Sequence, residues 1–123
     1  MKIQPIQSSS LTFGYSHQLK TLYRQGKLPI KYGFYGDKLT QKNVSLEHLK
    51  PHSKGGKTKL SNLVLASKQK NQARGNADIR NFANKETIAK YLSQFIDVKI
   101  KDFDGNKYIN DIIKTLTNLG VIK

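Results

Sequence analysis

The chain has 123 residues, contains no cysteine and carries a formal net charge of +14, with a sequence pI of about 10.0. This length suits one domain better than two, and the lack of cysteine excludes disulfides, thiolate zinc sites and a cysteine nucleophile. No apolar run is long enough to span a membrane, and the N-terminus lacks the apolar stretch of a signal peptide. We therefore expect a cytoplasmic, intracellular protein with no membrane partner.

The positive charge is concentrated in the first part of the chain. Residues 1–77 contain 14 Lys and Arg and two acidic residues, a net charge of +12. Residues 78–123 contain 8 Lys and Arg and six acidic residues, a net charge of +2. This asymmetry predicts a polyanion-binding part beside a packing part, and it favours nucleic acid over an anionic membrane as the polyanion.

The N-terminal part predicts little regular structure. Residues 1–16 lack periodicity and are expected to form a loose arm. A helix is predicted for residues 17–25, because apolar residues recur there at helical spacing, and Gly26 ends it. Residues 32–39 predict a β-turn or knuckle, in which Gly36 supplies an unusual backbone angle.

The most informative stretch is residues 44–76, which predicts four successive elements. They are a strand, a loop, a strand and a helix, over residues 44–48, 51–59, 62–65 and 67–74. The first strand alternates apolar and polar residues, and the loop is too rich in Pro, Lys and Gly for regular structure. The helix is polar without a β-branched residue, with Ser67 as its N-terminal cap and Gly75 just past its end.

Two amphipathic helices are predicted in the C-terminal part, within residues 84–119. Their apolar faces consist of Ile88, Tyr91, Leu92, Phe95 and Ile96 in the first, and Tyr108, Ile109, Ile112, Ile113 and Leu116 in the second. Asn84 is a candidate cap of the first helix. An extended link over residues 98–101 and a turn at Asp104-Gly105 are expected between the helices. Core packing is the simplest interpretation of both faces, and a homodimer interface is the alternative.

The order strand, loop, strand, helix, with Glu47-His48, Asn62 and Asn71 at their positions, resembles the HNH (ββα-metal, His-Me finger) nucleases. The resemblance covers about residues 32–76. Its motifs are Leu46-Glu47-His48, Pro51-His52-Ser53-Lys54-Gly55-Gly56, Leu60-Ser61-Asn62-Leu63 and Lys70-Asn71-Gln72-Ala73-Arg74-Gly75-Asn76. It implies a ββα-metal nuclease core. Together with the predicted N-terminal helix and two C-terminal helices, we expect an α+β fold in a single domain over residues 17–123.

Many relatives carry two pairs of cysteines that hold a structural zinc, and this chain has none. The corresponding positions are Tyr32, Tyr35, Ser67 and Lys70. All four ligands are missing together, so we expect no structural zinc. Aromatic packing by Tyr32, Phe34 and Tyr35 is the expected physical replacement, unless these are ordinary surface residues.

Phosphodiester hydrolysis needs an activated water and relief of charge on the phosphate and on the leaving oxygen. His48 can take a proton from water, because imidazole titrates near neutral pH. Glu47 can supply a hard oxygen ligand for Mg²⁺, Mn²⁺ or another divalent ion, and the amide oxygen of Asn71 can supply a second. Consecutive strand residues point to opposite faces, so Glu47 and His48 share a site only if the strand ends or bends there, as Lys50-Pro51 allows.

The resemblance implies the same roles: His48 as general base, and Glu47 and Asn71 as metal ligands. It adds Asn62 to the catalytic set, as the residue that fixes the loop between the strands through hydrogen bonds to backbone. The family more often has Asp at the position of Glu47. Each residue alone also has a structural interpretation, as a satisfied polar residue, a lysine partner, a turn residue or helix surface.

Basic residues surround these positions in sequence and are candidate phosphate contacts, which position nucleic acid without reading its sequence. They are Lys54, Lys57, Lys59, Lys68, Lys70, Arg74 and Arg80. Arg74 is the best single candidate, because it lies one turn after Asn71 and faces nearly the same way.

The sequence thus predicts a metal-dependent endonuclease that acts on DNA, with RNA not excluded, and that leaves 5′-phosphate and 3′-hydroxyl ends. Two alternatives stay open. One is a non-catalytic nucleic-acid-binding module on the same fold, and the other is a nuclease toxin with an acidic immunity protein as partner. The chain is expected to be a monomer, or a homodimer formed through the C-terminal helices.

Overall fold

The computed structural model describes residues 18–123, so the predicted arm over residues 1–16 and the first residue of the predicted N-terminal helix lie outside the described part. That helix is present over residues 18–24, and Gly26, with a φ of 74°, follows it. Leu19 and Leu22 bury one face of this short helix. The described elements combine helices with small antiparallel strands, which is an α+β fold.

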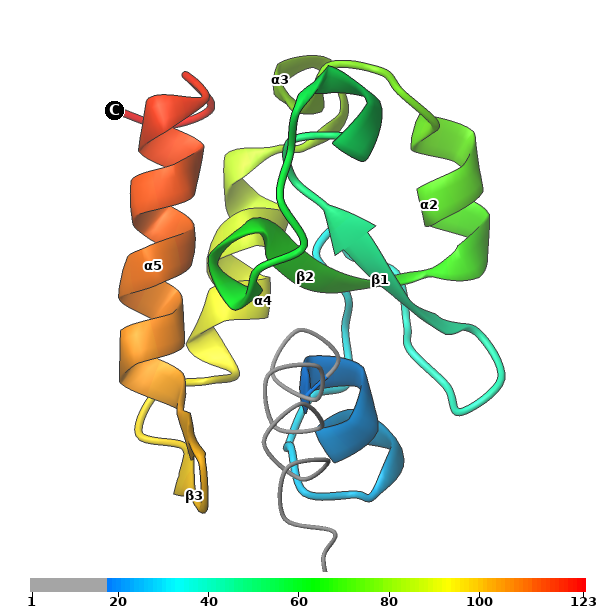
Figure 1. Cartoon of the computed structure of the whole chain (residues 1–123). Helices are drawn as coiled ribbons and strands as arrows, with labels where there is room; N and C mark the ends of the chain where they lie inside the picture. Colours follow the sequence, from blue (N-terminus) through cyan, green and yellow to red (C-terminus); the bar gives the residue numbers. More distant parts are fainter. Residues whose placement is uncertain (1–17) are drawn as a thin grey trace, which may run out of the picture.

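The central part of the molecule is a two-stranded sheet followed directly by a helix (Figure 1). Strands β1 (Val44–His48) and β2 (Leu63–Ser67) pair antiparallel. The loop between them contains two 3₁₀ turns, η1 (His52–Lys54) and η2 (Leu60–Asn62), and α2 (Lys68–Arg74) follows β2. The predicted order of strand, loop, strand and helix is confirmed, although Asn62 lies in η2 and not in the second strand.

The ends of α2 are set by the two residues that the sequence indicated. The Ser67 hydroxyl accepts a hydrogen bond from the Lys70 amide, 3.1 Å away, which satisfies one of the amides that a helix leaves unpaired at its start. Gly75 follows the helix with a φ of 53°, and its amide bonds to the Asn71 carbonyl. Both predicted caps are therefore confirmed.

The turn before β1 docks against the edge of β2 that β1 leaves unpaired. The Phe34 amide donates to the Leu65 carbonyl over 2.8 Å, and the Ser67 amide donates to a carboxylate oxygen of Asp37. Gly36 has a φ of 87°, the unusual backbone angle that the sequence predicted at this turn. The side chains of Phe34 and Tyr35 are buried as a result.

Two tyrosines from the C-terminal helices complete the closure of this edge. Tyr108 donates its hydroxyl hydrogen to the Leu63 carbonyl over 2.8 Å, and the Leu65 amide donates to the Tyr91 hydroxyl over 3.0 Å. The two hydroxyls lie 2.8 Å apart. Because the only hydrogen of the Tyr108 hydroxyl goes to Leu63, Tyr91 is the donor between them. The backbone groups of β2 on this side are thus satisfied inside the core.

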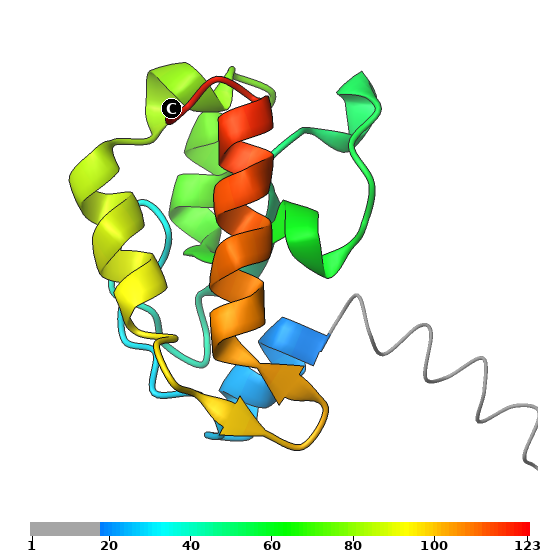
Figure 2. The same ribbon diagram turned by 90° about the vertical axis from the view of Figure 1, so that its left-hand side faces the viewer.

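The C-terminal part consists of α3 (Ile79–Phe82), α4 (Lys85–Ser93), the hairpin of β3 (Lys99–Ile100) and β4 (Phe103–Asp104), and α5 (Gly105–Asn118). Figures 1 and 2 show α5 standing on one side of the β1–β2 sheet, while α2 lies on the other. None of the described helices is long and apolar enough to cross a membrane.

Three details of this part differ from the prediction. The first C-terminal helix ends at Ser93 and not at Ile96, so the Ile96 side chain is 58% exposed and lies outside the apolar face. The expected extended link is one arm of the β3–β4 hairpin. Asp104 is the N-cap of α5 and not a turn residue, because its carboxylate accepts from the amides of Asn106 and Lys107.

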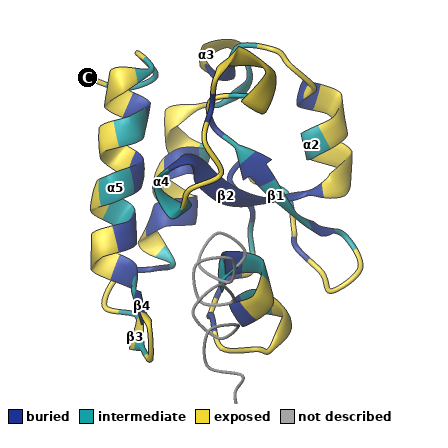
Figure 3. Ribbon diagram, in the orientation of Figure 1, coloured by how far each residue is buried: buried dark blue, intermediate teal, exposed yellow. Residues whose placement is uncertain are grey.

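The core lies between the sheet, α4 and α5, where the buried faces of the two helices meet (Figure 3). Its centre is aromatic: the rings of Tyr91 and Phe95 lie 5.1 Å apart, and those of Phe95 and Tyr108 lie 4.8 Å apart. Such edge-on and tilted ring pairs are stabilising beyond their buried area. Core packing is therefore the role of most of the apolar face residues, while Ile113 remains 39% exposed.

Candidate active site

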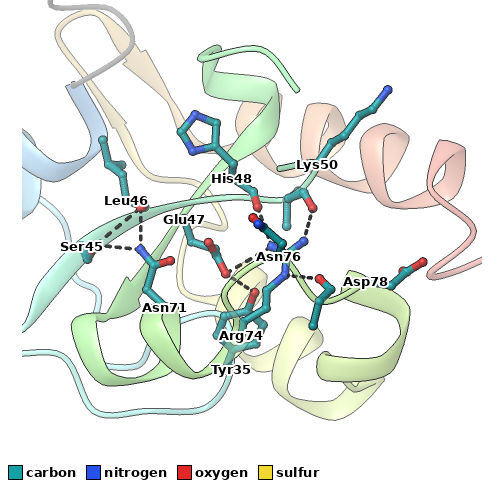
Figure 4. A network of polar contacts seen from close by, with 12 residues as sticks. Tyr35, Ser45, Leu46, Glu47, His48, Lys50, Asn71, Arg74, Asn76 and Asp78 are labelled. Carbon is teal, nitrogen blue, oxygen red and sulfur yellow. Dashed lines mark hydrogen bonds and ion pairs between the residues drawn. The ribbon is translucent and has the colours of Figure 1, made fainter. Parts of the chain in front are cut away.

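Helix α2 holds the outer edge of β1 through two side chains three residues apart on the helix. The amide nitrogen of Asn71 donates to the Leu46 carbonyl and to the Ser45 hydroxyl, each over 2.9 Å. Arg74 donates to the His48 carbonyl over 2.6 Å and to the Leu49 carbonyl over 2.9 Å. Residues at this spacing share a helix face, and here that face is turned toward β1 (Figure 4).

These contacts fix the orientation of the Asn71 amide. A backbone carbonyl can only accept, so the nitrogen of the Asn71 side chain must face Leu46 and its oxygen must face away. Both amide hydrogens are directed to β1, one to each partner. The amide oxygen is consequently the group that Asn71 can offer to a metal ion.

Glu47 is a buried carboxylate, only 4% exposed, with two partners from other elements. The hydroxyl of Tyr35 donates to its Oε2 over 2.5 Å, and Nη1 of Arg74 lies 3.2 Å from the same oxygen. Burial raises the pKa of Glu47, and the Tyr35 hydroxyl, the charge of Arg74 and the backbone of His48 oppose this rise without cancelling it. Because both side-chain contacts fall on Oε2, neither Tyr35 nor Arg74 occupies Oε1.

His48 points to the opposite side of β1 from Glu47, as Figure 4 shows. Its Nε2 lies 3.0 Å from the hydroxyl of Thr58, and its ring meets the ring of His52 edge-on, with centroids 6.3 Å apart. Burial lowers the pKa of His48, and the neighbouring His52 and Arg74 lower it further. This lowered pKa favours the neutral ring, the state in which it can accept a proton.

The structure thus places Glu47 and His48 at the end of β1, but their side chains lie on opposite faces of the strand. Glu47 is linked to α2 through Arg74, next to Asn71, whereas the His48 ring lies with the loop residues Thr58 and His52. β1 ends at His48, so both side chains stand at the C-terminal end of the strand.

Asn62 holds the loop between the strands from inside. Its Oδ1 accepts from the Lys50 amide over 2.9 Å, and its Nδ2 donates to the carbonyls of Lys50 and Lys57 over 3.1 and 2.8 Å. The side chain is 7% exposed. Asn62 therefore shapes the loop that carries Thr58 and His52, and its amide makes no contact with His48.

The expectation that Arg74 contacts phosphate is wrong, because Arg74 is 2% exposed and its guanidinium is engaged inside the protein. Besides Glu47, His48 and Leu49, it donates to the Ala77 carbonyl over 2.8 Å. The helix face was predicted correctly, but that face packs on β1 and not on solvent. The other candidate phosphate contacts are exposed: Lys54, Lys57, Lys59, Lys68, Lys70 and Arg80.

The four positions that correspond to zinc ligands have other contacts. Tyr35 binds Glu47, Ser67 caps α2, and the Tyr32 ring lies under the ammonium of Lys90, 3.9 Å from its centroid. Lys70 is exposed. Across residues 18–123 there is no cluster of three or more His, Cys, Asp or Glu side chains that could hold a metal ion. A site at β1 would therefore depend on the Asn71 amide.

Two site residues, Tyr35 and Thr58, were not identified from the sequence. Tyr35 was noted only as an aromatic residue at a missing zinc position, and its bond to Glu47 spans 12 residues. Thr58 lies in a loop of irregular structure, 10 residues from His48. No local pattern marks either contact.

Comparison with protein families agrees with the resemblance drawn from the sequence. A family model described as HNH endonuclease matches residues 34–78, the segment that contains the turn, β1, the loop, β2 and α2. No curated protein and no solved structure matches the chain.

Proposed function

We propose that this chain, which resembles the HNH endonucleases over residues 34–78, is a divalent-metal-dependent endonuclease that hydrolyses DNA phosphodiester bonds. The single observation that carries the proposal is the contact of α2 with β1. Both amide hydrogens of Asn71 are donated to β1, which leaves its amide oxygen for a metal ion. Arg74, on the same face of α2, contacts Glu47. In this proposal the unit of β1, β2 and α2 is the ββα-metal core that the resemblance implies.

The side chains at this end of β1 fit a hard divalent ion. Glu47 offers a carboxylate oxygen and Asn71 an amide oxygen, the donor types that Mg²⁺ and Mn²⁺ prefer. When bound, such an ion relieves negative charge on the scissile phosphate and on the leaving oxygen. Water molecules and substrate oxygens would supply the other ligands of such an ion, because the protein offers only two.

His48 is the proposed general base. Its neutral ring takes a proton from the attacking water while the new bond from water oxygen to phosphorus forms. The bond from phosphorus to the 3′ oxygen breaks, and that oxygen leaves as a 3′-hydroxyl after it takes up a proton from solvent. The hydroxyl of Thr58, 3.0 Å from Nε2, orients the ring. The products are a 5′-phosphate and a 3′-hydroxyl end.

The exposed lysines of the loop and of α2 are the proposed contacts for the DNA backbone. Lys54 and Lys57 lie in the loop, and Lys68 and Lys70 lie in the first turn of α2, all of them exposed to solvent. Such contacts raise affinity for any sequence. Arg80 is also exposed, but its guanidinium pairs with Asp78 at 2.8 Å, so we assign it a smaller share of the binding.

The test is incubation of the protein with plasmid DNA in Mg²⁺, in Mn²⁺ and in EDTA, with single-stranded RNA as a parallel substrate. We expect cleavage with either ion and none with EDTA. His48→Ala should lower the rate by about 10²–10⁴-fold or more while DNA binding persists. Gln69→Ala, on the exposed side of α2, is the matched control and should cleave as the wild type does.

DNA binding without cleavage under all three conditions would contradict the proposal and would support a non-catalytic binding module. Cleavage by His48→Ala at the wild-type rate, with folding verified by circular dichroism, would contradict the assignment of the base. Preferential cleavage of the RNA would correct the substrate without changing the site.

A further inference from the structure

We propose that Tyr35 and Arg74 are positioning residues that hold Oε2 of Glu47 and thereby present Oε1 to the divalent ion. This inference rests on the proposed function, because it assigns a task to residues around its metal ligand. Neither residue is proposed to touch substrate or metal. The two residues are called the Glu47 clamp below.

The geometry of the contacts supports the clamp. Tyr35 and Arg74 approach Glu47 from different elements, the turn before β1 and the end of α2, yet both bind the same carboxylate oxygen. Two donors on one oxygen fix the rotation of the carboxylate. Partners of this kind, which bind a metal ligand and not the metal, commonly set the orientation of that ligand.

Tyr35 is itself held rigidly. Its ring meets the rings of Phe34 and Phe82 edge-on, with centroid distances of 5.3 and 5.0 Å. The Tyr35 hydroxyl is the donor in its bond to Glu47, because an ionised carboxylate oxygen can only accept. A buried phenol in fixed packing gives the carboxylate little freedom to turn.

Arg74 completes the clamp and links it to β1. The guanidinium that lies 3.2 Å from Glu47 also binds the carbonyls of His48 and Leu49, so it fixes the end of the strand and the carboxylate together. Its charge offsets part of the cost of burying the carboxylate. Displacement of Arg74 would therefore move Glu47 relative to Asn71 and His48.

The experiment measures Mn²⁺ binding by electron paramagnetic resonance, in the absence of DNA, for the full chain and for four variants. Tyr35→Phe keeps the ring and removes only the donor, and we expect its Mn²⁺ affinity to fall by about 10-fold, the low end for such partners. Glu47→Gln should lose Mn²⁺ binding. Tyr91→Phe is the matched control, because it removes another buried phenol bond, to β2, and should keep the wild-type affinity.

A kinetic readout separates positioning from general loss of structure. In Tyr35→Phe the Mn²⁺ concentration for half-maximal cleavage should rise by the same factor, while the rate at saturating Mn²⁺ returns toward that of the wild type. Arg74→Lys serves as the second variant, because it retains the charge and loses the forked contacts. It should also bind Mn²⁺ more weakly.

The outcomes distinguish the clamp from the proposed function. If Glu47→Gln abolishes Mn²⁺ binding while Tyr35→Phe and Arg74→Lys bind as the wild type does, the clamp is wrong and the metal site stands. If Glu47→Gln binds Mn²⁺ as tightly as the wild type, both the clamp and the role of Glu47 as ligand are wrong. A lower thermal midpoint in Tyr35→Phe with unchanged Mn²⁺ affinity would likewise show that the tyrosine is only structural.

Discussion

Lys50 and Asn62 are joined by two reciprocal hydrogen bonds, with the Lys50 amide donating to Oδ1 over 2.9 Å and Nδ2 donating to the Lys50 carbonyl over 3.1 Å. A third bond, to the Lys57 carbonyl, ties in the far side of the same loop. One buried side chain thus replaces the backbone pairing that an irregular loop cannot form for itself. The position of Thr58 beside His48 depends on it.

Replacing Asn62 by Ala should therefore affect stability and catalysis together. We expect a loss of about 1–3 kcal/mol in the free energy of unfolding, because backbone groups lose their partners. Cleavage should also slow, because the loop no longer holds Thr58 against His48. Urea unfolding and plasmid cleavage measure the two effects. Asn81→Ala, on an exposed position of α3, is the control, and equal behaviour of the two variants would contradict the role of Asn62.

Arg74→Met should be strongly destabilising, by about 3–5 kcal/mol, because it leaves the Glu47 carboxylate buried without its cation. Lys70→Met, on the exposed side of the same helix, should change stability little. Denaturant unfolding measures both. The double variant Glu47→Leu, Arg74→Met should recover part of the loss. A mild effect of Arg74→Met would show that water or another group replaces the guanidinium.

The acid limb of the cleavage rate against pH should lie below the ordinary pKa of histidine. His48 must be neutral to act as a base, and burial, His52 and Arg74 all lower its pKa, so activity persists to lower pH. His52→Ala removes one of these causes, and the limb should move to higher pH. Ser53→Ala, at the next position, should leave it unchanged. An acid limb that does not move in His52→Ala would contradict the influence of that ring.

DNA binding should depend strongly on salt through the exposed lysines of the loop and of α2. Each phosphate contact contributes about −0.9 to the slope of log K against log salt on duplex DNA. Changing Lys54, Lys57, Lys68 and Lys70 together to Ala should reduce that slope by roughly 3–4 if each meets one phosphate. Lys114→Ala, on the exposed side of α5, should leave it unchanged. A larger effect of Lys114 would make α5 the DNA-binding element.

The protein should contain no structural zinc. Tyr35, Ser67 and Tyr32 make packing and capping contacts at positions where relatives would carry thiolates. Elemental analysis after purification with EDTA should find less than stoichiometric zinc, and EDTA should leave the thermal midpoint unchanged. One tightly held zinc per chain would show that the turn before β1 has been misinterpreted.

The sequence predicted what depends on neighbours along the chain. The caps at Ser67 and Asn84 and the left-handed angle at Gly36 follow from short-range rules, and the structure confirms each of them. Asp104 was the exception, because an Asp-Gly pair fits a turn and a helix start equally well.

The site was less predictable, because its contacts span long stretches of chain. The helical period of α2 correctly placed Arg74 near the face of Asn71, but nothing local indicates that this face lies against β1, where the acceptors are 25 and 26 residues away. The same holds for Tyr35, whose partner is Glu47. Residue types and spacing indicated candidates for the chemistry. The residues that hold these groups in place can be identified only from the folded structure.

Closure of the β1–β2 sheet has a consequence for how the protein behaves at high concentration. A two-stranded sheet has two outer edges, and an exposed edge can pair with a strand of another molecule and begin aggregation. Here Phe34, Tyr91 and Tyr108 cover β2, while Asn71 and Arg74 bind the outer carbonyls of β1. The residues that shape the site therefore also prevent a strand of another molecule from pairing with this sheet. A variant such as Arg74→Met leaves the outer carbonyl of His48 unpaired as well as the Glu47 carboxylate, and should therefore favour self-association.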